Sequence, residues 1–146
     1  YKVNVAFNMI KETSYTPRVT EVNSGNHIGN LNILAWFEDA RSFLTNLFQL
    51  SENGIAKTNA VIVNLDVNFI AEVHYGSDVK ISTSIVRLGN KSCSIYQEAK
   101  QQDALVASVE VTLVNFDMLQ RQSMSISDEL AEQLSVWQVE TTDSVL

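Results

Sequence analysis

The feature that most constrains the fold is one long apolar helix followed almost entirely by strand-like segments. Between Leu31 and Leu50, apolar residues recur at helical spacing and form one broad face: Ile33, Trp36, Phe37, Ala40, Phe43, Leu44 and Leu47. The aromatic residues on this face indicate a core helix rather than a surface helix. Asn30 or Asn32 is placed to cap its start, and Asn53-Gly54 ends the loop that follows it.

The chain after this helix reads as strands. Apolar and polar residues alternate with a period of two, which is typical of half-buried strands. The pattern predicts strands over 61–70, 79–86, 92–100 and 105–116, with turns at 88–91 and 101–103. Ser127 is expected to cap a short helix over Asp128–Trp137, whose first turn carries two acids. Before the long helix, strands are expected over 1–7 and 15–22, and the segment 23–30 is a loop.

This order predicts an α+β domain in which consecutive antiparallel strands wrap the apolar helix, because helix and sheet each have one face to bury. The other face of the sheet and its edges would stay exposed. Pairing with a second copy would remove an edge, so we expect a dimer. One domain is expected over residues 1–138, with 139–146 as a flexible C-terminal tail.

Composition excludes several classes of function. The 146 residues carry a net charge of −7, and an acidic surface repels phosphate backbones, so we expect no nucleic-acid partner. No apolar run approaches the roughly 18–20 residues that span a bilayer, so we expect no membrane partner. A single cysteine, Cys93, leaves no internal disulfide and suits a reducing compartment, which predicts a cytoplasmic protein.

Common catalytic motifs are also missing from the sequence. Two histidines and one cysteine at unrelated spacing do not predict a metal site. There is no Walker loop, no G-x-G-x-x-G and no G-x-S-x-G nucleophile elbow. No metal and no cofactor is therefore expected.

The segment that suggests chemistry is the loop from Glu21 to Asn30, directly before the core helix. It gathers polar side chains at a helix N-terminus, where backbone N–H groups can bind a carbonyl or stabilise an oxyanion: Glu21, Asn23, Ser24, Asn26, His27 and Asn30. The alternative is that Asn and Gly serve only as turn residues and that His27 is a surface histidine. Composition and spacing leave both interpretations open.

A family resemblance favours the first interpretation. Thr20–Arg41 resembles the signature of the hotdog-fold acyl-CoA thioesterases of the 4-hydroxybenzoyl-CoA thioesterase-like family, roughly D-x-D-x-x-G-H-V-N-N followed by an apolar helix with E-E-A-R. His27 falls on the signature histidine, Asn30 on its last asparagine, and Glu38–Arg41 on E-E-A-R. Downstream, Tyr75–Val79 is similar to the family's Y-G-D loop and Ile85–Ser92 to its V-x-R-L-G-x-x-S hairpin, so the resemblance covers roughly residues 15–135. It implies a hotdog fold.

The chain departs from the signature where the family's base or nucleophile stands. The second Asp falls on Asn23, whose neutral amide neither accepts a proton from water nor attacks as a carboxylate. The first Asp falls on Glu21, the Gly on Asn26 and the first Asn of the pair on Gly29. Three interpretations follow. Asn23 orients a water or the carbonyl while Glu38, Asp39 or His27 is the base; or Glu21 substitutes; or the chain binds acyl thioesters and turns them over poorly.

The resemblance implies a hydrolase, an acyl-CoA or acyl-carrier-protein thioesterase acting as a homodimer or homotetramer. The expected catalytic residues are Asn23, His27, Glu38 and Asp39, and the expected substrate-binding residues are Glu21, Asn26, Asn30, Arg87 and Lys91. Arg87 and Lys91 would contact the phosphates of coenzyme A. The alternative is a non-catalytic acyl-thioester-binding hotdog module. A hotdog dehydratase would need a different arrangement of His and acid. Cys93 is expected to be a packed residue rather than a nucleophile.

Overall fold

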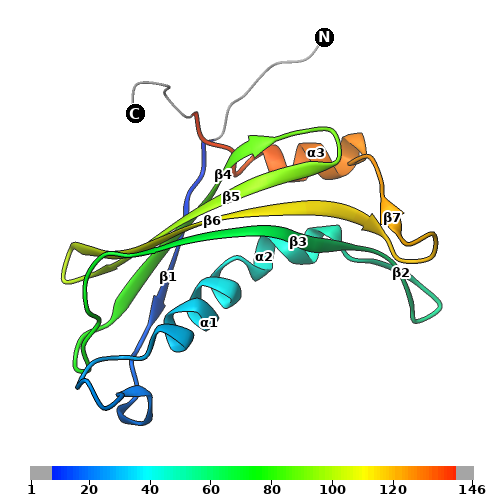
Figure 1. Cartoon of the computed structure of the whole chain (residues 1–146). Coiled ribbons are helices and arrows are strands. Elements are labelled where there is room, and N and C mark those ends of the chain that lie inside the picture. Colours follow the sequence, from blue (N-terminus) through cyan, green and yellow to red (C-terminus); the bar gives the residue numbers. More distant parts are fainter. Residues whose placement is uncertain (1–7, 141–146) are drawn as a thin grey trace.

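The computed structural model describes residues 8–140, in which an antiparallel sheet curls around one helix (Figure 1). The strand order across the sheet is β1-β4-β5-β6-β3-β2, and the short strand β7 pairs with β6. The strands are β1 (Lys11–Tyr15), β2 (Leu50–Glu52), β3 (Ile55–Phe69), β4 (Val79–Leu88), β5 (Ser92–Gln101), β6 (Ala104–Asp117) and β7 (Gln122–Ser123). This is the α+β hotdog arrangement that the resemblance implied, and the four strands and two turns expected after the helix are confirmed.

The helical segments are short. They are η1 (Val19–Glu21), α1 (Asn30–Ala40), α2 (Ser42–Thr45), η2 (Asn46–Phe48) and α3 (Asp128–Ser135), where η denotes a 3₁₀ helix. Ser127 caps α3 as expected, because its hydroxyl accepts the Leu130 N–H at 3.1 Å. No helix within residues 8–140 is long and apolar enough to span a bilayer.

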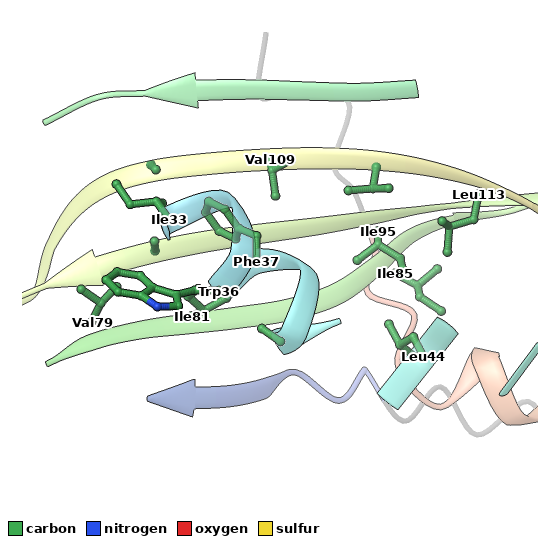
Figure 2. Close-up of a cluster of buried hydrophobic side chains, with 14 of the residues drawn as sticks. Ile33, Trp36, Phe37, Leu44, Val79, Ile81, Ile85, Ile95, Val109 and Leu113 are labelled. Atoms are coloured by element: carbon green, nitrogen blue, oxygen red, sulfur yellow. The ribbon is translucent and has the colours of Figure 1, made fainter. Parts of the chain in front are cut away.

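The core lies between α1 and the concave face of the sheet. Figure 2 shows Ile33 and Phe37 of α1 beside Val109 of β6, with Ile95 of β5 in the same layer. Phe37, Leu44 and Phe48 are fully buried, and each such side chain contributes roughly 1.5–3 kcal/mol to folding. Register shifts in β3 and β4, at Ile62/Asn64 and Ile85/Arg87, are the kind of irregularity that bends strands and lets the sheet curl.

The expected single helix over Leu31–Leu50 is wrong beyond Ala40. Ser42 Oγ donates to the Asp39 carbonyl at 2.7 Å and so competes for a helical acceptor. From the sheet, Gln97 Nε2 donates to the Phe37 carbonyl at 3.0 Å. The Phe37 carbonyl also keeps its helical hydrogen bond from the Arg41 N–H, at 3.2 Å. Arg41 itself takes a non-helical conformation, and the chain continues as the short α2. Leu50 starts a strand instead of ending the helix, since its N–H donates to Thr58 Oγ1 at 3.2 Å.

A buried polar cluster lies at the break in the helix. The Gln97 side chain also donates to Thr83 Oγ1 at 3.0 Å and accepts from Arg41 Nη1 at 3.3 Å. Arg41 is only 4% exposed, and burial lowers the pKa of its guanidinium, an effect that the charge of Glu38 opposes. Each buried polar group of this cluster thus has a partner, as buried polar groups require.

The strand expected before the loop is also misplaced. The strand expected over 15–22 is present only at Tyr15, where β1 ends. The chain then turns into η1 because the Glu21 carboxylate accepts the Arg18 N–H at 2.7 Å. The strand expected over 1–7 lies outside the described residues.

At the C-terminal end, pairing extends past the expected domain boundary. Gln138 bridges Ile85, and the Val139 N–H donates to the Ile85 carbonyl at 2.9 Å. The division into a domain over 1–138 and a tail over 139–146 stays a prediction. Residues 141–146 lie outside the described part of the chain.

Candidate active site

The loop before α1 is a small closed turn that presents His27. The Asn23 N–H donates to the His27 carbonyl at 2.9 Å, and Val22 bridges Ile28. Asn23 Oδ1 accepts the N–H groups of Gly25 and His27 at 3.0 and 3.4 Å. Asn26 takes the left-handed conformation, with φ of 63°, which Asn tolerates better than most residues. Asn23 and Asn26 are thus the residues that shape the turn.

Gly25 leaves room for the imidazole of His27. A Cβ at this residue would come within 3.0 Å of His27 Nε2. The His27 ring therefore packs directly over the Gly25 backbone, and its Nδ1 lies 3.3 Å from the Ile28 carbonyl. These contacts fix the ring at the edge of the loop, half-buried rather than free in solvent.

The N-terminus of α1 is left without a side-chain cap. Helix α1 begins at Asn30 with Gly29 as its N-cap. The expected cap by Asn30 or Asn32 is wrong, because Asn32 Nδ2 instead donates to the Glu21 carbonyl at 3.5 Å. The first N–H groups of a helix have no intrahelical partner and carry partial positive charge. In α1 the Asn32 N–H already donates to the Gly29 carbonyl at 3.1 Å, so the N–H groups of Asn30 and Leu31 are the ones left to bind a carbonyl oxygen or an oxyanion.

This helix end borders a small, mainly apolar cavity. Its volume is about 260 Å³, and it is lined by His27, Ile28, Asn30, Ile33 and residues 69–73. The Ile28 N–H donates to the Val73 carbonyl at 2.7 Å, which ties the loop to the segment after β3. An apolar wall with a few polar groups at one end is the usual character of a small-molecule site.

A larger hollow of about 500 Å³ has a different character. It is lined by exposed charges and short polar side chains: Glu12, Ser77, Asp78, Lys80, Ser82, Glu98, Lys100, Gln102 and Asp103. None of the residues expected from the sequence to form the site lies in it. We therefore assign the candidate site to the smaller cavity at His27.

The two adjacent acids of α1 have different surroundings. The Tyr15 hydroxyl donates to Asp39 Oδ2 at 2.6 Å, and its ring stacks on Trp36. Burial, together with this hydrogen bond, raises the pKa of Tyr15. Asp39 therefore faces β1, at the edge of the sheet farthest from β2 and β3.

Glu38 is exposed and lies about 100° around the helix from Asp39. Residues four apart stack on one side of an α-helix, so Asn30, Leu34 and Glu38 form one row. Asn30 lines the cavity at the start of this row. At about 100° per residue, Glu38 is turned roughly 80° from Asn30 around the helix and Asp39 roughly 180°. Glu38 thus lies nearer than Asp39 to the side that carries the cavity, although it does not line the cavity within one protomer.

The other expected site residues are not brought to the cavity. The Glu21 carboxylate is used by the Arg18 N–H, as described above. Arg87 donates to Ser92 Oγ at 2.9 Å and to Ser94 Oγ at 3.2 Å. Arg87 is eight residues from the start of β4, which is about 26 Å in a strand. Arg87 and the nearby Lys91 thus lie at the far end of the protomer.

Cys93 is excluded as a nucleophile. The residue is fully buried, and burial raises the pKa of its thiol to about 11. The reactive thiolate is therefore almost absent at neutral pH.

The residues that sequence reasoning missed are the apolar walls of the cavity. Phe69 ends β3, the longest strand, and Ile70 and Val73 follow it. The signal in the sequence was that apolar residues continue after the alternating stretch, as far as Val73.

The chain is similar to known proteins over most of its length. Residues 17–134 match the family model described as the thioesterase-like superfamily. Among curated proteins, none matches the sequence significantly. Among solved structures, a predicted thioesterase from Bacillus stearothermophilus is 30% identical with a TM-score of 0.82, over 92% of this chain and 100% of that one.

Two more distant structures share the fold. The hypothetical protein SAV2348 from Staphylococcus aureus, solved in complex with CoA, is 14% identical with a TM-score of 0.77, over 96% of this chain and 92% of that one. A 1,4-dihydroxy-2-naphthoyl-CoA thioesterase from Synechocystis is 13% identical with a TM-score of 0.72, over 87% of this chain and 96% of that one. At these identities the likeness concerns the fold.

Proposed function

This chain belongs to the thioesterase-like superfamily and is a thioester hydrolase, and we propose that it cleaves acyl thioesters of coenzyme A or acyl carrier protein to the free acid and thiol. The observation that carries the proposal is the uncapped N-terminus of α1, which opens beside His27 onto an apolar cavity. Two of the similar structures, one solved in complex with CoA and one described as a 1,4-dihydroxy-2-naphthoyl-CoA thioesterase, support the choice of an acyl-CoA as substrate.

In this proposal the thioester carbonyl sits at the helix N-terminus. The free N–H groups of the first turn polarise the carbonyl, and they stabilise the negative charge that develops on its oxygen. His27, held over Gly25, contacts the same carbonyl or the attacking water. The acyl group lies against the apolar residues Ile33, Phe69 and Ile70.

Glu38 is the proposed base. Its carboxylate takes a proton from water, the water oxygen bonds to the carbonyl carbon, and the C–S bond then breaks. The thiolate leaves with the electron pair of that bond and is protonated to the thiol. Asp39 is not the base in this scheme because Tyr15 occupies it on the other flank of α1.

The placement of Glu38 requires two copies of the chain. Eight residues separate Asn30 from Glu38, so their Cα atoms are about 12 Å apart along the helix. In a dimer paired antiparallel through β3, the two α1 helices also run antiparallel, and Glu38 of one copy approaches the N-terminus of the other. We therefore place each site between two copies, in a homodimer or a dimer of dimers, and we locate the protein in the cytoplasm.

Turnover of acyl-CoA substrates tests the function. With a panel of acyl-CoAs of different chain length and with aromatic acyl groups, the purified protein is expected to release free thiol with saturation kinetics. The measurement is the appearance of coenzyme A thiol against substrate concentration. A dimer that binds acyl-CoA by calorimetry and releases no thiol would instead support the non-catalytic binding module.

Assembly is tested separately. Light scattering after size-exclusion chromatography is expected to give two or four times the 16.3 kDa mass of the chain. The physical reason is the unpaired apolar edge of β3. A monomer at micromolar concentration that still turns over acyl-CoA would contradict a site built between copies and would leave the thioesterase function intact.

A further inference from the structure

One edge of β3 is open along most of its length. On one side β3 pairs with β6 from Thr58 to Phe69. On the other side β2 covers only its first residues, from Ile55 to Thr58. Among residues 8–140 no strand pairs with this side of β3 beyond Thr58. The open segment, residues 59–69, is roughly 35 Å long at about 3.4 Å per residue.

The open edge lacks the usual protection against pairing. Monomeric proteins commonly place Lys, Pro or several charges on such an edge. Residues 59–69 contain one charged residue, Asp66, and no lysine or proline. Large apolar side chains on this segment and just after it are exposed: Val61, Ile62, Val63, Leu65, Phe69 and Ile70. The edge therefore fits a second copy of itself.

The position of β2 fixes where such a second strand must end. Two copies of one edge pair antiparallel about a two-fold axis near the middle of the open segment. The β3 strand of the second copy then runs along residues 59–69 until it meets β2, which is hydrogen-bonded to the same edge. The first residue of β2 is Leu50, opposite Thr58. The strand of the second copy ends at Phe69, so Ile70 of that copy meets Leu50.

The two side chains brought together are suited to contact. Leu50 is 61% exposed and Ile70 is 53% exposed, and burying such side chains against each other is favourable. Ile70 also lines the cavity at His27. The β2–β3 hairpin projects at the end of the sheet away from the loop before α1 (Figure 1). The two-fold axis carries this hairpin to the cavity of the other copy.

We propose that Leu50 of a second copy packs on Ile70, closes the open side of the cavity at His27, and helps to determine which acyl groups the site accepts. This inference rests on the proposed function and on its dimer. An aliphatic wall at this place favours an apolar acyl group. A larger residue at position 50 would shorten the space that the cavity leaves for the acyl group.

Disulfide trapping tests the contact without any need for turnover. A protein with Leu50→Cys is mixed with a protein with Ile70→Cys, the subunits are allowed to exchange, and the mixture is oxidised. A disulfide-linked dimer is expected only in the mixture, because a disulfide needs Cα atoms within about 7 Å. The native Cys93 is buried and does not compete. The matched control is Leu119→Cys, which replaces another exposed leucine on the β6–β7 turn.

The results separate this inference from the proposed function. No disulfide in a folded dimer, or an equally fast disulfide with the Leu119→Cys control, overturns the Leu50–Ile70 contact whether or not the protein is an enzyme. In an active protein, Leu50→Trp is expected to lower kcat/KM for the longest accepted acyl-CoA by roughly tenfold relative to the shortest. Equal effects on long and short substrates would contradict a role in acyl selection.

Discussion

Replacing Glu38 by Gln is expected to lower kcat by roughly 10²–10⁴ while the protein stays folded and dimeric. The amide has nearly the shape of the carboxylate but cannot take a proton from water. The side chain is exposed in the protomer, so its loss leaves the core unchanged. The measurement is the rate of thiol release at saturating acyl-CoA, with circular dichroism as the check on folding.

The neighbouring residue provides the matched control. Asp39→Asn changes the same chemical group one residue away, on the flank of α1 that holds Tyr15. It is expected to retain the rate within a few-fold and to lower the free energy of unfolding by about 1 kcal/mol, because the tyrosine loses a charged acceptor. If both amide variants kept the native rate, the base would not be a helix acid, and His27 would become the candidate.

The same variants test whether each site uses two copies. Glu38→Gln mixed with His27→Ala, each nearly inactive alone, should recover up to about a quarter of the native rate after subunit exchange if Glu38 acts across the interface. A mixed dimer then contains one intact site and one site with both changes. Absence of recovery, in dimers shown to exchange, would place both residues of a site in one chain.

The elements that sequence predicts well here are those set by local chemistry. The Ser127 cap depends on a hydroxyl and an N–H three residues away. The turn expected at 101–103 is present, with Gln102 and Asp103 both at positive φ. Asn53-Gly54, expected to end the loop after the helix, instead forms the turn between β2 and β3, where both residues have the positive φ that Asn and Gly favour. The alternation of 61–70 predicts a strand because its period is a property of the segment itself.

The elements that sequence places wrongly are set by distant partners. The core helix is interrupted at Arg41, a residue whose side chain donates to Gln97 far along the chain. The two acids of α1 look alike in the sequence, and the hydrogen bond from Tyr15 to Asp39 comes from a strand that the helix pattern does not show. Pattern within a segment cannot show which residue of another strand will lie beside it.

The candidate site likewise contains residues that the sequence identified and residues that only the structure identifies. His27 and Asn30 were identified from a motif, and they do border one cavity. Arg87 and Lys91, expected to contact the phosphates of coenzyme A, lie at the other end of the sheet within one protomer, and that role stays a prediction. Phe69 and Ile70 supply walls of the cavity from the end of β3. The strand order of the assembled sheet shows that β3 has an open edge, and the sequence pattern does not show this.

Asn23→Asp is expected to lower kcat/KM by roughly 10²-fold in an enzyme whose base is Glu38. The loop should keep its shape, because a carboxylate oxygen also accepts the N–H groups of Gly25 and His27 that Asn23 Oδ1 accepts. What changes is the other half of the side chain: an amide N–H₂ is lost, and a negative charge stands in the loop before the helix N-terminus where the oxyanion forms. The measurement is kcat/KM across pH, with Asn23→Ala as the control that removes both loop hydrogen bonds.

The opposite sign would favour the binding module. If this chain binds acyl thioesters and lacks a base, the Asn23→Asp change restores the carboxylate found in the family signature, and thiol release should rise. The nearby charge of Glu21 would raise the pKa of the new carboxyl group, so the gain should grow as the pH rises and the group ionises. A fall in the rate of thiol release at every pH supports Asn23 as a neutral part of the site. In that case the added negative charge at residue 23 destabilises the transition state. An unchanged rate in an active enzyme would place the oxyanion away from this loop, and the assignment of the α1 N-terminus would have to be given up with it.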